Sequence, residues 1–150
     1  MKCYSAVDMA DLEHNVNAVL ADFPEVVAAY LFGSRAGSRP RRTSDVDVAL
    51  IFDARTDRER RFLTRCLLSE RLARAARATS ADVVDLETAT PLLAHEILRT
   101  RRLLFSRDEA RRVGVAARQM MRYMDGRPMR RVLDEATVRR LREGFLGRLA

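Results

Sequence analysis

The sequence predicts a mixed α/β domain of the α+β kind, in which helices flank a small mixed β-sheet and a helical arm follows. Three observations support this. Two short apolar runs, 26–32 and 46–52, end at polar or glycine residues, as buried strands do. Around them, apolar residues recur with helical spacing. The 150 residues, 47% of them hydrophobic and 33% charged, are sufficient for one globular core.

The first half of the chain alternates helix and strand. Helical periodicity covers residues 8–21, and the strand 26–32 then stops at Gly33. A polar loop, 35–44, leads into the strand 46–52. Thr56 and Glu59 have the spacing of a capping box and predict a helix that reaches about residue 78. Cys66 falls within the apolar pattern of this helix and is expected in the core.

The second half begins with a third strand, predicted over 81–86, and ends in helices. Thr90 and Pro91 predict the N-cap and first position of a helix to about residue 100, before a short edge strand at 103–105. Ser106 and Glu109 form a second capping-box pattern, which predicts a helix to about 124. Gly126 and Pro128 interrupt the pattern, and a basic helix is expected at 135–149.

This order of elements predicts a core of residues 1–106 and a C-terminal helical arm of residues 107–150. The arm carries more apolar side chains than a solvated tail requires. We therefore expect it to pack on the core, or to form an interface with a partner or a second copy of the chain.

Composition restricts the class of partner. The formal net charge is +7, and it comes almost wholly from arginine because Lys2 is the only lysine. A basic chain favours anionic partners such as nucleotide phosphates, nucleic acid or an acidic protein surface. No RNA-binding module is recognisable, so direct nucleic-acid binding is not expected.

The location of the protein is predicted from its cysteines and apolar segments. Cys3 and Cys66 have neither metal-site nor disulfide spacing, which indicates a reducing cytoplasm. The N-terminus does not resemble a signal or transit peptide. No segment approaches the roughly 20 apolar residues of a membrane helix, so no membrane association is expected.

Two aspartates two residues apart form the first candidate site. Asp45 and Asp47 alternate along a strand, so their carboxylates project from one face, while Val46 and Val48 occupy the other. Carboxylates this close repel each other, and Mg²⁺, which prefers oxygen ligands, would neutralise them. The same spacing also occurs at solvated strand edges, so the pair by itself is weak evidence.

Two other segments of the chain offer further candidate residues for the same site as Asp45 and Asp47. Gly33 and Ser34 follow a buried strand, where a turn can point backbone N–H groups at a phosphate. The strand 81–86 offers a third carboxylate, from Asp82 or Asp85, that would complete a metal site or accept a proton. Strand alternation alone does not decide which of these two faces the first pair.

Together, Gly33-Ser34, ten intervening residues and Asp45-Val-Asp47 resemble the signature of the polymerase-β-like nucleotidyltransferase superfamily, in its minimal (MNT) members. Ser44 before the first aspartate and the acidic strand downstream are similar too. The resemblance covers roughly residues 9–107. Many relatives have an arginine between the residues that correspond to Ala36 and Gly37, and this chain lacks it.

The resemblance implies a polymerase-β-like fold and a set of roles for site residues. Gly33 and Ser34 would hold the triphosphate of ATP, and the adjoining Arg35 and Ser44 would belong to the nucleotide site. The catalytic carboxylates would bind two Mg²⁺ ions. They are Asp45, Asp47 and, by position in the motif and in preference to Asp85, Asp82.

The resemblance also implies a reaction and a partner. Small MNT proteins are similar to the antitoxin half of HEPN–MNT toxin–antitoxin pairs, in which AMP from ATP is added to a tyrosine of the HEPN ribonuclease. The implied partner is therefore a cognate HEPN toxin. Two alternatives remain open: nucleotidyl transfer to a small molecule, and a non-catalytic module that binds its partner.

Overall fold

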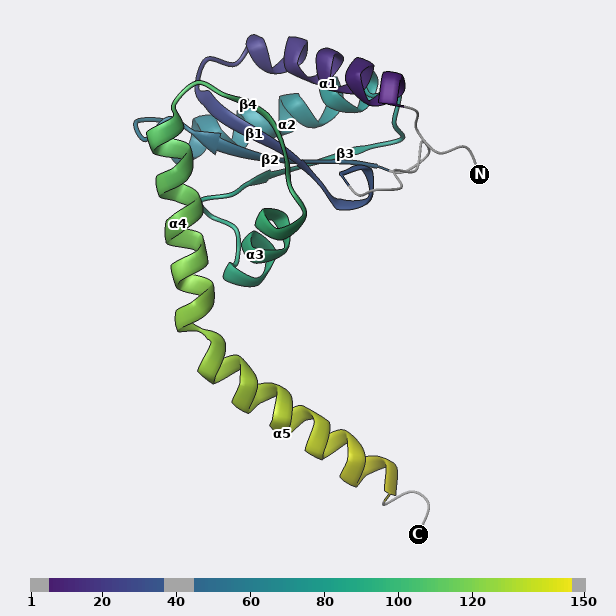
Figure 1. Ribbon diagram of the computed structural model, residues 1–150, viewed down its shortest axis with the longest axis vertical. Helices are drawn as coiled ribbons and strands as arrows, with labels where there is room; N and C mark the ends of the chain where they lie inside the picture. The colour runs from purple at the N-terminus through teal and green to yellow at the C-terminus, as the bar shows by residue number, and fades with distance from the viewer. Residues whose placement is uncertain (1–5, 37–44, 147–150) are drawn as a thin grey trace.

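A four-stranded mixed sheet with helices on both faces forms the body of the molecule in the computed structural model, which describes residues 6–36 and 45–146 (Figure 1). The strand order is β3-β2-β1-β4. Strand β1 (Val26–Phe32) runs antiparallel to β2 (Val46–Phe52) and to β4 (Arg102–Ser106). Strand β3 (Ala81–Asp85) runs parallel to β2. The predicted fold class is confirmed.

Helices α1 (Ala6–Ala21) and α2 (Arg58–Ala75) cover one face of the sheet (Figure 1). Their apolar stripes pack on alternate residues of the strands, because successive strand side chains point to opposite faces. Leu68 and Leu72 of α2 are fully buried there, as are Val46 and Val48 of β2. The face of β2 that carries Val46 and Val48 is therefore the one that packs on α1 and α2.

Helices α3 (Pro91–Thr100) and α4 (Glu109–Asp125) cover the opposite face. Ile97 of α3 and Val115 of α4 are buried against it. The two helices also meet through an aromatic contact: the His95 and Tyr123 rings are stacked, with centroids 3.8 Å apart and planes within 6°. Helix α4 is the first part of the predicted arm, and it packs on the body of the domain. This is one of the two arrangements expected for the arm.

Helix α5 (Arg127–Leu146) leaves the body and extends away from it (Figure 1). It begins eight residues before the helix predicted at 135–149, because Pro128 sits in the first turn, where its missing N–H is not needed. None of the described side chains of α5 is buried. Among residues 6–36 and 45–146, no helix is both long and apolar enough to cross a bilayer.

The N-termini of α2, α3 and α4 show whether the three N-caps predicted from the sequence are correct. The Thr90 hydroxyl accepts a hydrogen bond from the Leu93 N–H at 3.3 Å, which confirms that cap. The other two predicted caps are wrong. Asp57 caps α2 in place of Thr56, and Asp108 caps α4 in place of Ser106. An aspartate is at least as good an N-cap as serine or threonine, so the aspartate side chain takes this position in each case.

The prediction that Cys66 lies in the core is wrong, because its side chain is exposed on α2. The helix buries Thr64, Leu68 and Leu72, which share one side at four-residue spacing. Phe62, Leu63 and Leu67 are exposed with Cys66. The apolar residues of this helix are thus spread over more than one side, and only one side meets the sheet.

Side chains of α1 and α2 donate hydrogen bonds to backbone carbonyls of the two edge strands, β4 and β3. The Ser69 hydroxyl donates to the carbonyl of Ala81 at 2.6 Å, and Arg65 Nε donates to the carbonyl of Val83 at 3.0 Å. Both carbonyls belong to β3. At the other edge, Asn17 Nδ2 of α1 donates to the carbonyl of Leu104 in β4 at 3.2 Å.

Candidate active site

The strand register brings the candidate residues to one level of the sheet. Phe32, the last residue of β1, pairs with Asp47 of β2, and Asp47 pairs with Asp82 of β3. Asp45 immediately precedes β2. Asp47 is half-buried, whereas Asp45 and Asp82 are exposed. The predicted carboxylates and the glycine-serine turn after β1 therefore lie at neighbouring positions.

Gly33 lies directly against the carboxylate of Asp47. A Cβ atom built on Gly33 would be 2.2 Å from Asp47 Oδ2, a distance that no real side chain tolerates. The backbone of Gly33 has a φ of +69°, in the left-handed region that glycine adopts without steric cost. Glycine is required here for two independent reasons, and its missing side chain lets the turn approach the acidic pair.

The environment of Asp47 disfavours its negative charge. Burial raises the pKa of the Asp47 carboxyl, and the negative charges of Asp82 and Asp45 raise that pKa further. The positive charge of Arg35 lowers the pKa and offsets part of this effect. Asp45 and Asp82 are therefore each close enough to repel the charge of Asp47, and a bound cation would relieve that repulsion.

Arg35 was expected to contact the nucleotide, but its side chain lies inside the domain with 0% of its surface exposed. One guanidinium nitrogen donates to the carbonyl of Ala76, just beyond α2, at 3.2 Å. Arg35 is the last residue of the 3₁₀ turn η1 (Gly33–Arg35) and the buried residue of that turn. In the sequence, Arg35 stands at the start of the polar loop 35–44, and only the structure reveals that its side chain is buried.

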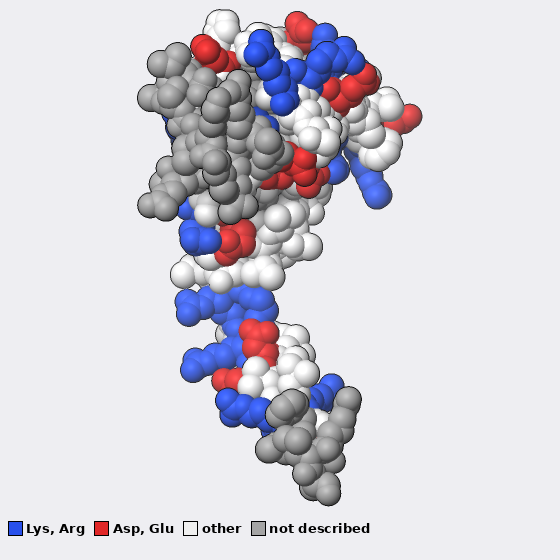
Figure 2. Space-filling model, turned by 90° about the vertical axis from the view of Figure 1, so that its right-hand side faces the viewer, with Lys and Arg blue, Asp and Glu red and all other residues white. Residues whose placement is uncertain are grey.

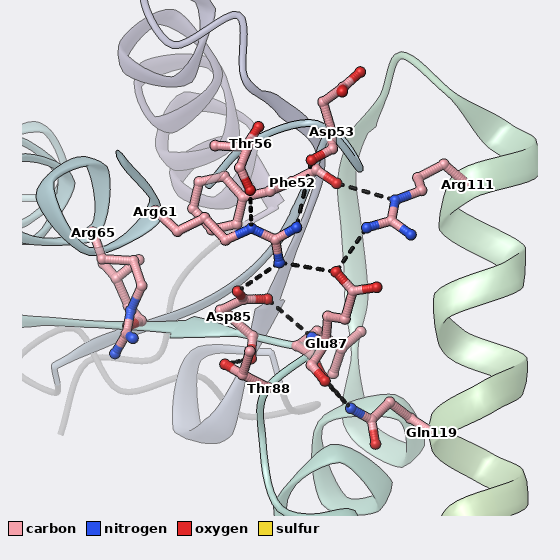
Figure 3. A network of polar contacts seen from close by, with 12 residues as sticks. Phe52, Asp53, Thr56, Arg61, Arg65, Asp85, Glu87, Thr88, Arg111 and Gln119 are labelled. Carbon is pink, nitrogen blue, oxygen red and sulfur yellow. Dashed lines mark hydrogen bonds and ion pairs between the residues drawn. The ribbon is translucent and has the colours of Figure 1, made fainter. Parts of the chain in front are cut away.

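Asp85 points into a polar network that includes Arg61 and Glu87 (Figure 3). Its carboxylate accepts from Arg61 at 3.1 Å and is almost fully buried. Arg61 also donates to Glu87 at 2.8 Å, and Glu87 accepts from Arg111 of α4 at 2.7 Å. Asp85 lies on the α2 side of β3, while Asp82, three residues earlier, lies on the α3 side with Asp47.

This ion-pair network joins α2, the end of β3 and α4. The pKa of the Glu87 carboxyl is lowered because hydrogen bonds and positive charges from Arg61 and Arg111 outweigh its burial. Arg111 Nε also donates to the carbonyl of Phe52 at 3.1 Å. The sequence contained no motif for this network, whose members are far apart along the chain.

Residues 14–110 match the family model described as polymerase beta, nucleotidyltransferase. The chain belongs to the polymerase β nucleotidyltransferase family. A search of the curated proteins gives no match.

Several solved structures share the fold of this nucleotidyltransferase. One is a toxin–antitoxin crystal structure with AMP-PNP: 24% identity, TM-score 0.68, covering 84% of this chain and 98% of that one. Another is the MntA–HepT toxin–antitoxin structure: 22% identity, TM-score 0.65, covering 85% and 97%. A third holds tri-AMPylated HEPN toxin with MNT antitoxin from Shewanella oneidensis: 21% identity, TM-score 0.64, covering 85% and 98%.

The residues of this nucleotidyltransferase suit a divalent cation by their chemistry. Three carboxylates supply hard oxygen donors, and the raised pKa of Asp47 reflects a concentration of negative charge. Within residues 6–36 and 45–146, no three acidic, histidine or cysteine side chains are already grouped as a metal site. Ion binding would therefore have to draw these carboxylates closer together.

The remaining predicted residues of the nucleotidyltransferase site are Ser34 and Ser44. Ser34 is exposed in the η1 turn beside Gly33, where its backbone and hydroxyl can face a ligand. Ser44 lies outside the described residues, as does the rest of the loop 37–44.

Proposed function

We propose that this protein is a Mg²⁺-dependent nucleotidyltransferase that transfers AMP from ATP to a tyrosine of a cognate HEPN ribonuclease toxin, and thereby acts as its antitoxin. One observation carries the proposal: Gly33 lies against Asp47, while Asp82 pairs with Asp47 on the neighbouring strand. Family membership supports nucleotidyl transfer. Fold neighbours crystallised with AMP-PNP and with an AMPylated HEPN toxin suggest the donor and the acceptor.

The proposed roles of the residues follow from their positions. The exposed turn of Gly33 and Ser34 would hold the triphosphate through backbone N–H groups, with Ser44 as a further contact. Asp45, Asp47 and Asp82 would hold two Mg²⁺ ions. When bound, these ions would polarise the acceptor and stabilise the charge on the triphosphate. Buried Arg35 would support the ionised state of Asp47 rather than contact phosphate.

The proposed reaction is an in-line displacement at the α-phosphate. The tyrosine oxygen forms a bond to the α-phosphorus, the bond between that phosphorus and the bridging oxygen breaks, and pyrophosphate leaves. The phenolic proton passes to Asp82, which is exposed beside Asp47. Most of the acceleration would come from positioning and from neutralising charge.

We place this reaction in the cytoplasm. The proposed acceptor is a macromolecule. The matched family domain takes up residues 14–110, and the described remainder consists chiefly of α4 and α5. A tyrosine presented by a separate protein would have direct access to the exposed Asp45 and Asp82.

Labelled ATP provides the test. The purified chain is incubated with α-³²P-ATP and Mg²⁺, with and without the purified product of the neighbouring gene, and the label is followed by gel and mass spectrometry. The Asp45→Asn and Asp47→Asn variants should lose nearly all transfer. The matched control is Asp11→Asn, which removes a carboxylate from an exposed position of α1 and should leave transfer unchanged.

Each other outcome contradicts a defined part of the proposal. Full transfer by Asp45→Asn would contradict the metal assignment. A tight complex of the two proteins without label would favour a non-catalytic binding module. Label that appears on added small molecules, and never on the partner, would favour small-molecule nucleotidylation.

A further inference from the structure

Helix α5 has no described side chain buried in the domain, although it contains 20 residues. Most of the stability of a helix in a protein comes from packing an apolar face, and the described side chains of α5 have no such packing in this domain. Five large apolar side chains of α5 are nevertheless more than two-fifths exposed. These exposed side chains are Met129, Val132, Leu133, Val138 and Leu141.

The apolar residues in the first half of α5 form a continuous stripe. Met129, Val132, Leu133 and Ala136 follow the spacing i, i+3, i+4, i+7, which places them on one side of the helix. The three large side chains are 65%, 62% and 57% exposed. This is the anchor pattern of a helix that inserts into the groove of another protein.

The base of α5 is held in place relative to the body. The Arg130 guanidinium lies 4.2 Å from the centroid of the Tyr123 ring and donates to the Tyr123 carbonyl. The Tyr123 ring also stacks on His95 of α3. These contacts fix the start of α5 against α4, and such preorganisation lowers the entropic cost of binding.

Charge indicates the kind of partner. Helix α5 carries six arginines against three acidic residues, and the whole chain has a net charge of +7, so pairing with a second copy would bring like charges together. On the face of this helix that Figure 2 shows, arginines lie at one side and uncharged surface at the other, with acidic side chains between them. Arg140, three turns after Met129 on the same side, makes no ion pair with the described residues.

We infer that the stripe of Met129, Val132, Leu133 and Ala136 is a docking face for a different protein, one that offers an apolar groove ending in carboxylates for Arg140. This inference rests on the proposed function, because it takes the toxin that accepts AMP as the docked protein. Docking through α5 holds that protein next to the domain while its tyrosine enters the active site.

The test compares two identical substitutions on opposite sides of α5. Leu133→Glu places a charge in the stripe, and Val138→Glu places the same charge on the other side of the same helix. Binding of the purified neighbouring-gene product is measured by calorimetry without ATP, and circular dichroism checks that both variants melt like the wild type. We expect Leu133→Glu to weaken binding at least about 30-fold, as loss of an interface hot spot does.

Two further readouts complete the expectation. Val138→Glu should change the dissociation constant less than about threefold, and Arg140→Glu should weaken binding and reduce its salt dependence. Amide hydrogens of residues 129–140 should gain protection from exchange when the partner is added. Equal effects of the two glutamate variants, or no effect of either, would overturn the inference.

The remaining outcomes separate docking from catalysis. A wild-type chain that dimerises alone, and that Leu133→Glu makes monomeric, would show that a second copy covers the stripe. Binding that Leu133→Glu disrupts, without any transfer of label, would refute AMP transfer and leave the docking face intact. No binding of the neighbouring-gene product to the wild type would refute this partner for the stripe.

Discussion

The Gly33→Ala substitution tests the contact at the centre of the candidate site. The new methyl carbon would lie 2.2 Å from Asp47 Oδ2. Ordinary contact needs about 3.4 Å or more, so the turn and the carboxylate must separate by about 1 Å. The substitution also places an alanine at a φ of +69°, which costs about 1–2 kcal/mol for a residue with a side chain.

These two effects predict different sizes of change in stability and in activity. The backbone cost should lower the melting temperature by about 2–8 °C for a chain of 150 residues. Displacing Asp47 by about 1 Å should reduce AMP transfer by about 100-fold, because catalysis depends on this positioning. The assays are thermal melting by circular dichroism and the labelled-ATP reaction at saturating Mg²⁺.

Gly114→Ala is the matched control. A Cβ on Gly114, within α4, would meet only the end of the flexible Arg118 side chain, at 3.4 Å. Both stability and transfer should stay close to wild type, with a slight gain in stability from helix propensity. The reasoning fails if Gly33→Ala transfers AMP within threefold of the wild-type rate. It also fails if Gly114→Ala loses as much activity.

Three further predictions concern the ion pairs and the metal. Arg61→Met should lower the free energy of unfolding, measured in urea, by about 3 kcal/mol, because it leaves buried Asp85 without its cation. Adding Asp85→Asn to this variant should restore part of the loss. If the losses of the two single variants add instead, the pairing of Arg61 with Asp85 is contradicted. Hydrogen bonds from Arg112 and Ser106 lower the pKa of Glu109 to about 2 from 4.5, so its stabilising effect is complete above pH 4.5 and is lost as the pH falls toward 2. Melting curves of Glu109→Gln should therefore converge with those of the wild type at pH 2, and a constant difference from pH 7 to pH 2 would refute the assignment. EDTA should abolish AMP transfer, and added Mg²⁺ should restore it; metal-independent transfer would exclude the proposed role of the aspartates.

The central strands were predictable because their sequence signals are local. The apolar runs 26–32 and 46–52 coincide with β1 and β2 to the residue, since each is short and bounded by residues that stop a strand. The distance from Gly33-Ser34 to Asp45 and Asp47 also led to the family that the comparison shows. Local pattern and family signature thus indicated the same fold.

The features that could not be predicted depend on what packs against each element. Alternation placed Asp82 and Asp85 on opposite sides of β3 but could not show that α2 and Arg61 cover the side of Asp85. Cys66 was misplaced because α2 has apolar residues on more than one side. Arg35 stands at the start of a polar loop in the sequence, and its burial depends on packing between the turn η1 and the end of α2.

The hydrogen bonds that Ser69 and Arg65 make to β3 bear on the solubility of this protein. An open strand edge is a template on which other chains add and aggregate. In the native state, α2 occupies two outward carbonyls of β3, those of Ala81 and Val83, and so hinders such addition. Local unfolding of α2 would release this edge while the rest of the sheet persists. Aggregation should therefore begin from a state in which α2 has come away from β3, well before the whole domain unfolds.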